Sequence, residues 1–174
     1  MSGSRTRSLQ EAPGLAQLAV QMLTEEGPIS PFSRADAEQL LPYLRLVDVP
    51  KGATLMQEGD QLHTGHLLLV LEGQISVHTV VAGASIEVAV VGPGDLLGEV
   101  ALLDGGPRTA SCSALSEAKV AALGRQALHQ LLQVNPAVAA HLLAALGRRM
   151  AGRIRELDAQ LEMYMQLVGE QQQR

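Results

Sequence analysis

The chain begins with a helical spacing of apolar residues and then changes to short apolar runs separated by turns. Over 14–28, leucine, alanine and methionine recur every three or four positions before a Gly-Pro pair, which predicts one short amphipathic helix. Ser33 and Asp36 have the spacing of a capping box and predict a second helix, which Pro42 interrupts. Residues 1–10 are rich in Ser, Arg and Gly, and we expect a mobile tail there.

The middle of the chain shows the pattern of an antiparallel β structure. Its apolar runs are short, evenly spaced and separated by turns that contain Gly, Pro or Asp. The predicted fold class is therefore α+β: an antiparallel β-roll (jelly-roll) barrel, flanked by N-terminal helices and a long C-terminal helix. The predicted strands are 46–49, 54–57, 66–71, 74–81, 85–91, 111–114 and 119–123.

The last third of the chain returns to helical spacing. A helix is predicted over 125–133, and Pro136 is suited to the first turn of the next one. In that final helix, apolar residues are mostly separated by alternating steps of four and three, which is typical of a coiled-coil seam. We expect its first half to pack on the barrel and its second half to form a parallel homodimer. The seam residues are Leu146, Met150, Ile154, Leu157, Leu161, Tyr164 and Val168.

Composition excludes several classes of function. The chain of 174 residues is 47% apolar and 18% charged, which is a globular composition with room for one domain and peripheral helices. Its net charge of -5 and its three aromatic residues are unsuited to nucleic acid, so we expect no direct nucleic-acid binding. No segment is long and apolar enough for a membrane span. Cys112, the single cysteine, fits a reducing cytoplasmic environment.

A glycine-rich segment late in the barrel carries the candidate chemistry. Glu99 follows Gly98, and Arg108 follows after a short gap. A carboxylate accepts hydrogen bonds from vicinal hydroxyls, and a guanidinium binds phosphate bidentately. The apolar run after Gly98 predicts one helical turn with free N–H groups, and the hydroxyls of Thr109 and Ser111 are further phosphate donors. Ribose and phosphate together indicate a nucleotide.

The run GDLLGEVALLDGGPRTAS at 94–111 resembles the phosphate-binding cassette of cyclic-nucleotide-binding domains. That family includes the catabolite activator protein, the regulatory subunits of protein kinase A, protein kinase G and cyclic-nucleotide-gated channels. The turns at 50–52, 58–60, Gly73 and 94–95 also resemble the turns of the family's β-roll. The resemblance implies binding of cAMP or cGMP, without a metal, and no enzymatic activity.

The resemblance also implies roles for individual residues. Glu99 would bind the ribose 2′-hydroxyl and Arg108 the cyclic phosphate, while Gly98 would permit a close backbone approach. Arg149 and Arg153 match positions that reach the nucleotide in some relatives; alternatively they form a solvated basic face. The other implied ligand-binding residues are Val100 and Ala101 in the turn, Thr109 and Ala110 beside the phosphate, and Val77 and Val88, core positions that pack on sugar and base. A hydroxyl at Thr109 leaves cGMP open beside the commoner cAMP.

We expect three segments: an N-terminal tail and short helix at 1–30, the cyclic-nucleotide-binding β-roll with flanking helices at 31–135, and a lid and dimerisation helix at 136–174. Relatives that bind DNA continue into a helix-turn-helix, which this sequence does not show. The favoured interpretation is a stand-alone cytoplasmic receptor that signals to an unknown protein effector. Two alternatives are a dimeric interaction protein with an orphan pocket, and the sensor fragment of a transcription regulator or channel.

Overall fold

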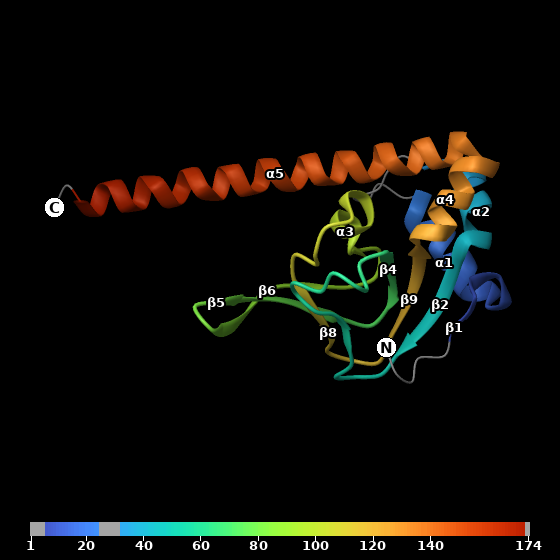
Figure 1. The fold of residues 1–174 in the computed structure, drawn as a ribbon, viewed down its shortest axis with the longest axis horizontal. Helices are drawn as coiled ribbons and strands as arrows, with labels where there is room; N and C mark the ends of the chain where they lie inside the picture. The colour runs from blue at the N-terminus through green and yellow to red at the C-terminus, as the bar shows by residue number, and fades with distance from the viewer. Residues whose placement is uncertain (1–5, 25–31, 173–174) are drawn as a thin grey trace.

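The computed structural model describes residues 6–24 and 32–172 (Figure 1). It contains two antiparallel sheets, with helices packed on one of them and one long helix that extends past the sheets. The predicted α+β fold class is confirmed. The strands are β1 (Thr6–Ser8), β2 (Leu44–Val49), β3 (Thr54–Met56), β4 (His66–Glu72), β5 (Ile75–Val81), β6 (Ala84–Val91), β7 (Leu96–Leu97), β8 (Ser111–Ala114) and β9 (Ala118–Gly124). The helices are η1 (Leu9–Glu11), α1 (Pro13–Thr24), α2 (Arg34–Leu40), η2 (Leu41–Tyr43), α3 (Glu99–Asp104), α4 (Arg125–Val134) and α5 (Pro136–Gln172).

The two sheets enclose one core, and the helices enclose another. The strand order is β1-β2-β9-β4-β7 in the larger sheet and β3-β8-β5-β6 in the smaller one. Successive side chains of a strand point to opposite faces. In β4, Leu68 and Val70 therefore join the core between the sheets, while Leu67, Leu69 and Leu71 join the core under the helices. This strand is a continuous apolar run because both of its faces are covered.

The predicted mobile tail is wrong for the part of it that the structure describes. Residues 6–8 form the edge strand β1, in which Thr6 pairs with Val47 and Ser8 with Arg45. Leu9, in the following η1, is fully buried in the helical core. Three polar residues at a sheet edge carry no periodic pattern, so this strand could not be predicted from the sequence. Residues 1–5 lie outside the described residues.

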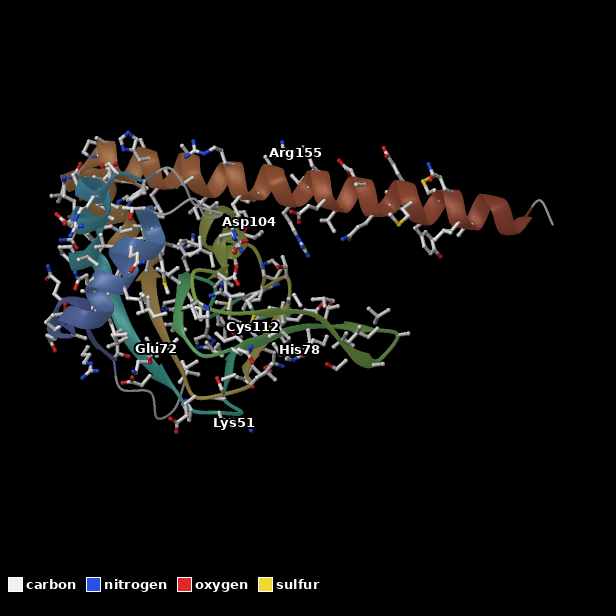
Figure 2. The ribbon with its side chains drawn as sticks, turned by 180° about the vertical axis from the view of Figure 1, so that it is seen from behind. Lys51, Glu72, His78, Asp104, Cys112 and Arg155 are labelled. Atoms are coloured by element: carbon white, nitrogen blue, oxygen red, sulfur yellow. The ribbon has the colours of Figure 1, made fainter. Side chains whose placement is uncertain are left out.

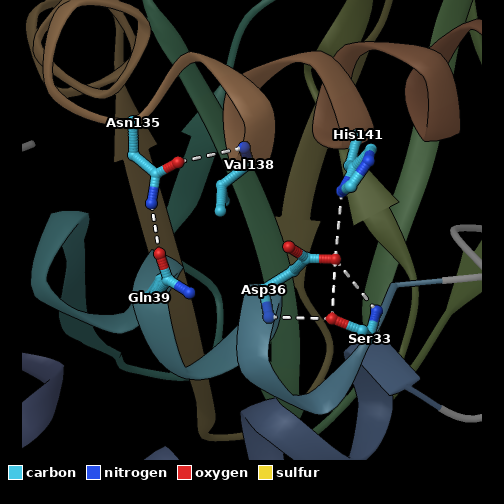
Figure 3. A network of polar contacts seen from close by, with 6 residues as sticks. All are labelled: Ser33, Asp36, Gln39, Asn135, Val138 and His141. Carbon is cyan, nitrogen blue, oxygen red and sulfur yellow. Dashed lines mark hydrogen bonds and ion pairs between the residues drawn. The ribbon is translucent and has the colours of Figure 1, made fainter.

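The capping box predicted at the start of α2 is confirmed. The Ser33 hydroxyl accepts a hydrogen bond from the backbone N–H of Asp36 and donates one to its carboxylate, which also accepts from the backbone N–H of Ser33 (Figure 3). The same carboxylate lies 3.1 Å from Nδ1 of His141 on α5. Asn135, just before α5, donates to the side chain of Gln39 and accepts from the N–H of Val138. These contacts hold α2 against the start of α5. The predicted helix stop at 27–28 lies outside the described residues.

Helix α5 begins at Pro136, as predicted, and its 37 residues span about 55 Å at the α-helical rise. Its first turns are buried in the helical core through Val138, Leu142 and Leu146. From Ile154 onward the apolar seam is exposed, because the helix runs over α3 and past the end of the roll (Figure 1). The expected packing of the first half is therefore confirmed as far as Leu146. No helix in the described part of the chain has the length and apolar character needed to cross a bilayer.

We predict that Asp36→Asn destabilises the fold relative to the parent protein, and that the loss of stability is larger at neutral pH than at acid pH. Hydrogen bonds from Ser33, assisted by His141, hold the pKa of Asp36 below its usual value of 3.8. A lowered carboxyl pKa stabilises the fold above pH 3.8, and that stabilisation is lost as pH falls below 3.8. Melting temperatures followed by circular dichroism from pH 2.5 to 7 measure the difference.

Glu38→Gln is the matched control, because it removes a charge from the same helix where the ion pair with Arg34 is exposed on both sides. Such a pair contributes about 0 to 1 kcal/mol. A difference in melting temperature between Asp36→Asn and the parent that stayed constant from pH 2.5 to 7 would contradict the lowered pKa of Asp36.

Candidate functional site

The segment between β7 and β8 holds the residues with candidate chemistry in a fixed geometry. Gly98 has a φ of +82°, and α3 begins directly after it. A Cβ at this position would lie 2.4 Å from Nη1 of Arg108 and 2.7 Å from the carbonyl oxygen of His66. Only glycine satisfies both the backbone conformation and this close approach. The helical turn predicted after Gly98 is confirmed as α3, and Gly105, directly after its last residue, has the same left-handed conformation.

The Arg108 side chain is buried and has no carboxylate partner. The residue is 4% exposed. Its Nε and Nη2 donate to the carbonyl of His63 at 3.3 and 2.9 Å, and its Nη1 donates to the carbonyls of His66 and Gly98 at 3.1 Å each. Among the described residues, no carboxylate lies within ion-pair distance of it. The guanidinium is therefore a buried cation whose hydrogen-bond acceptors are all neutral.

Burial lowers the pKa of Arg108, and the nearby Cys112, Asp60 and Glu99 oppose that shift. The residue keeps its charge, because an arginine side chain is not deprotonated in proteins. A buried charge without an opposite charge is unfavourable. The site therefore favours an anion.

The backbone around Arg108 is tied to the turn before β4 and to β5. Arg108 donates its N–H to the carbonyl of Asp60 and accepts at its own carbonyl from Gly59. Glu58 accepts from the hydroxyl of Thr79 and the N–H of Val80, and donates its N–H to the hydroxyl of Ser111. The Ser111 hydroxyl therefore already accepts a hydrogen bond from the backbone, and Ser111 does not line the cavity beside Arg108. This does not support its expected role as a phosphate donor.

One cavity of about 390 Å³ is lined by ten of the eleven residues to which the family resemblance assigns ligand binding. Its size lies within the roughly 300 to 1,000 Å³ typical of small-molecule pockets. Its walls come from β3, β5, β6, β7, α3, the segment at 108–112 and α5. The predicted residues that line it are Val77, Val88, Gly98, Glu99, Val100, Ala101, Arg108, Thr109, Ala110 and Arg153. The lining residues that the sequence did not single out are Met56, Thr79, Leu96, Leu97 and Cys112.

Two of the expected residues are placed differently from the prediction. Val88 is 50% exposed and is not a core residue, because β6 is the edge strand of the smaller sheet and extends with β5 beyond the roll (Figure 1). Arg149 does not line the cavity; its Nε lies 4.0 Å from a carboxylate oxygen of Glu99, and its Nη2 donates to the carbonyl of Leu96. Arg149 thereby connects α5 to the rim of the cavity.

The two arginines of α5 have different environments. The Arg149 side chain is 21% exposed, so a solvated basic face does not describe it. The Arg153 side chain is 61% exposed, lines the cavity and lies 3.6 Å from a carboxylate oxygen of Glu156. Arg149 contacts the site, and Arg153 is a solvated cation at its edge.

Cys112 and the histidines show no sign of metal chemistry in the described residues. Cys112 lies inside the roll below α3 (Figure 2). Burial raises the pKa of its thiol to about 11, so it behaves as a small apolar residue. No group of three or more histidine, cysteine or acidic residues in the described part of the chain is arranged to hold a metal ion.

A further contact, which no sequence pattern predicts, joins α3 to α4. Nη2 of Arg125, the first residue of α4, donates to the carbonyl of Ala101 at 2.9 Å. Leu102 of α3 is buried in the same core as Leu128 and Leu131 of α4. The turn that borders the cavity is therefore joined to α4 by one hydrogen bond and shares a hydrophobic core with it.

The sequence of residues 46–135, just over half of the chain, matches the family described as Cyclic nucleotide-binding domain. The chain belongs to this family. It is 35% identical over 129 residues, 74% of its length, to the Cyclic AMP receptor protein of Thermus thermophilus. It is 30% identical over 112 residues, 64% of its length, to the CRP-like cAMP-activated global transcriptional regulator of Mycobacterium tuberculosis.

The chain spans about half the length of these curated relatives, 57% of the first and 49% of the second. The crystal structure of a cyclic nucleotide-binding domain from Methylobacillus flagellatus is similar with a TM-score of 0.74 and 30% identity, over 83% of this chain and 81% of that one. The resemblance noted in the sequence, and the β-roll it implies, are confirmed.

We predict that Gly98→Ala destabilises this cyclic nucleotide-binding domain more than Gly94→Ala does. Both glycines have left-handed backbones, with φ of +82° and +92°, so both substitutions introduce about 1 to 3 kcal/mol of strain. Only at Gly98 would the new Cβ also clash with Arg108 and with the His66 carbonyl, since nothing lies within 4 Å at Gly94. Urea unfolding of the two variants measures the difference. Equal losses of unfolding free energy would show that the close approach at Gly98 is not required.

Proposed function

We propose that the chain is a cyclic-nucleotide receptor that binds its ligand in the 390 Å³ cavity and changes the position of α4 and α5 on binding. Arg108 binds the cyclic phosphate, with the Thr109 hydroxyl and the Ala110 N–H as further donors. Glu99 accepts a hydrogen bond from the ribose 2′-hydroxyl. Val77 and Val88 contact the sugar and the base, and Gly98, Val100 and Ala101 form the backbone surface beneath the phosphate and ribose.

The observation that supports this proposal most is the buried Arg108 guanidinium. It lines the cavity, is 4% exposed and has only neutral carbonyl oxygens as acceptors. An anion in the cavity would supply the missing opposite charge through charge-assisted hydrogen bonds. Glu99 on the same cavity wall suits a ligand that also carries hydroxyls. A cyclic nucleotide combines both features in one small molecule.

The link from ligand to helix movement runs through three contacts. Glu99 is paired with Arg149 of α5, Ala101 accepts from Arg125 of α4, and Leu102 packs in the core with α4. A ligand that rearranges the turn at Glu99 changes all three at once. It can shift the helices only by as much as its affinities for the two arrangements differ. A hundredfold preference corresponds to about 2.7 kcal/mol.

Between the two nucleotides, we favour cAMP. The relatives from Thermus thermophilus and Mycobacterium tuberculosis are named for cAMP. Thr109 is exposed and lines the cavity, and we propose that its hydroxyl contacts the phosphate or, with cGMP, the guanine base. Isothermal titration calorimetry with cAMP and with cGMP shows which of the two nucleotides binds more tightly. Tighter binding of cGMP would reverse this choice.

A dimer through α5 is the second part of the proposal. The exposed seam contains Ile154, Leu157, Leu161 and Tyr164, whose exposed fractions are 57%, 49%, 57% and 65%. Exposing this apolar stripe to water is unfavourable for a single helix, whereas two parallel copies would bury the stripe between them. The same surface would serve an interaction protein with an orphan pocket. Failure of nucleotide binding together with a stable dimer would favour that alternative.

We predict that Arg108→Ala weakens cyclic-nucleotide binding by about 2 to 5 kcal/mol, the cost of leaving a buried charge unpaired. Glu99→Ala removes a hydrogen bond to a neutral hydroxyl and costs about 1 to 3 kcal/mol. Calorimetry with cAMP measures both changes. Arg155→Ala on α5 (Figure 2) is the matched control, because this exposed arginine does not line the cavity. An Arg108→Ala protein that binds cAMP as tightly as the parent would refute the proposed site.

We predict that Leu157→Glu converts the dimer into a monomer at micromolar protein concentration. The substitution places a charge in the apolar seam, whereas Gln160→Glu adds the same charge at an exposed polar position of the helix. Sedimentation equilibrium of the parent and both variants gives the masses. If the parent itself sedimented as a monomer, or if both variants dissociated alike, this interface would be wrong.

A further inference from the structure

A second cavity, of about 650 Å³, lies at one end of the β-roll. The alternation of β2 and β4 that directs Val47 and Leu68 into the roll places Arg45 and His66 on the same inner faces, one step closer to this end. Arg45 and His66 both line the cavity. Nothing in the proposed nucleotide site uses this space.

The lining combines an apolar floor with a cationic rim. Val47, Leu68 and Ala122 are buried residues of the core between the sheets, and they form part of the floor. Arg45 is exposed on the rim, and no described residue forms a hydrogen bond or an ion pair with its side chain. Two other basic groups, His63 and His66, also line the cavity.

The cavity's single acidic lining residue is already engaged. One carboxylate oxygen of Asp60 accepts from the N–H groups of Leu62 and His63, and the other lies 2.9 Å from Nδ1 of His63. Burial, together with the charges of Arg108 and His63, lowers the pKa of His66 below 6.5, so this side chain is neutral at pH 7. The positive charge at the cavity therefore comes from Arg45 and Arg108.

Arg108 and Met56 line both cavities and separate them. The Arg108 guanidinium donates to the carbonyls of His63 and His66, two residues that line the second cavity. It also donates to the carbonyl of Gly98, which lines the nucleotide cavity. One guanidinium therefore borders both cavities.

We propose that this second cavity binds an amphipathic organic anion, with an apolar body on the floor and one carboxylate at Arg45. The size of this cavity lies in the range of small-molecule sites, and its lining offers both apolar surface and polar groups to a ligand. Inorganic anions lack the apolar body and use only the rim. The anion also draws on the positive charge of Arg108, so it opposes binding of a nucleotide phosphate on the other side. Binding of the anion stands alone, whereas this antagonism rests on the proposed nucleotide function.

The probe for this site is decanoate, and inorganic phosphate is titrated in parallel as an anion that has no apolar body. Calorimetry of the full chain is expected to show saturable decanoate binding, with phosphate at least tenfold weaker. Arg45→Glu is expected to weaken decanoate binding at least tenfold, and Arg155→Glu to leave it unchanged. Gln130→Glu, which adds a negative charge to the rim from the exposed face of α4, is expected to weaken it as well and guards against misfolding of the first variant.

Amide chemical-shift changes locate the ligand. Shifts at Arg45, Leu68, Ala122 and Gly124 support the proposal, whereas shifts confined to the exposed apolar residues of the β5–β6 hairpin or of α5 overturn it. Equal affinity for phosphate and decanoate also overturns it, as does an Arg45→Glu protein that binds decanoate like the parent.

The antagonism is tested by repeating the decanoate titration with saturating cAMP. Coupling between two sites is reciprocal, so cAMP is expected to weaken decanoate binding by the same factor by which decanoate weakens cAMP binding, about fivefold or more. Unchanged decanoate affinity in the presence of bound cAMP overturns the antagonism. If cAMP does not bind at all while decanoate binding depends on Arg45, the nucleotide proposal fails and the second site stands.

Discussion

The buried charge of Arg108 is the constraint on which the site depends. Three backbone carbonyls, from His63, His66 and Gly98, hold its guanidinium between two cavities. They come from the segment before β4, from the first residue of β4 and from the residue before α3, so the charge is positioned only in the folded roll. Because these acceptors are neutral, the protein retains an unmatched positive charge in its interior. That charge explains both the proposed phosphate site and the proposed antagonism from the second cavity.

The two hydrophobic cores connect the nucleotide cavity to the helices. The core between the sheets fixes the walls of the nucleotide cavity, while the core under the helices includes Leu102 from the cavity-bordering turn. Arg125 and Arg149 add polar contacts from α4 and α5 to the same region. Under the proposed function, a change at the turn would reach both α4 and α5, and α5 is joined to α2 through His141 and Asp36.

The sequence predicted the regular elements and the cassette well, because each has a local pattern. Turn glycines, strand alternation and the capping box at Ser33 all depend on near neighbours in the chain, and the structure places them within one or two residues of the expectation. It did not predict β1, whose pairing with β2 joins residues far apart in sequence. Nor did it predict that Arg125 contacts Ala101, or that Arg149 contacts Glu99 and not the cavity. Those contacts depend on how distant elements pack.

Hydrogen exchange with and without saturating cAMP tests the central claim most directly, because it reports on both the site and the helices. The account predicts slower exchange at 98–111, where a phosphate held by Arg108 would engage the backbone N–H groups, and altered exchange from 125 to 155. It predicts no change in β1 and β2. Slower exchange confined to 98–111 would mean a binder that does not switch. Unchanged exchange throughout, at a concentration where cAMP should saturate the protein, would contradict the account.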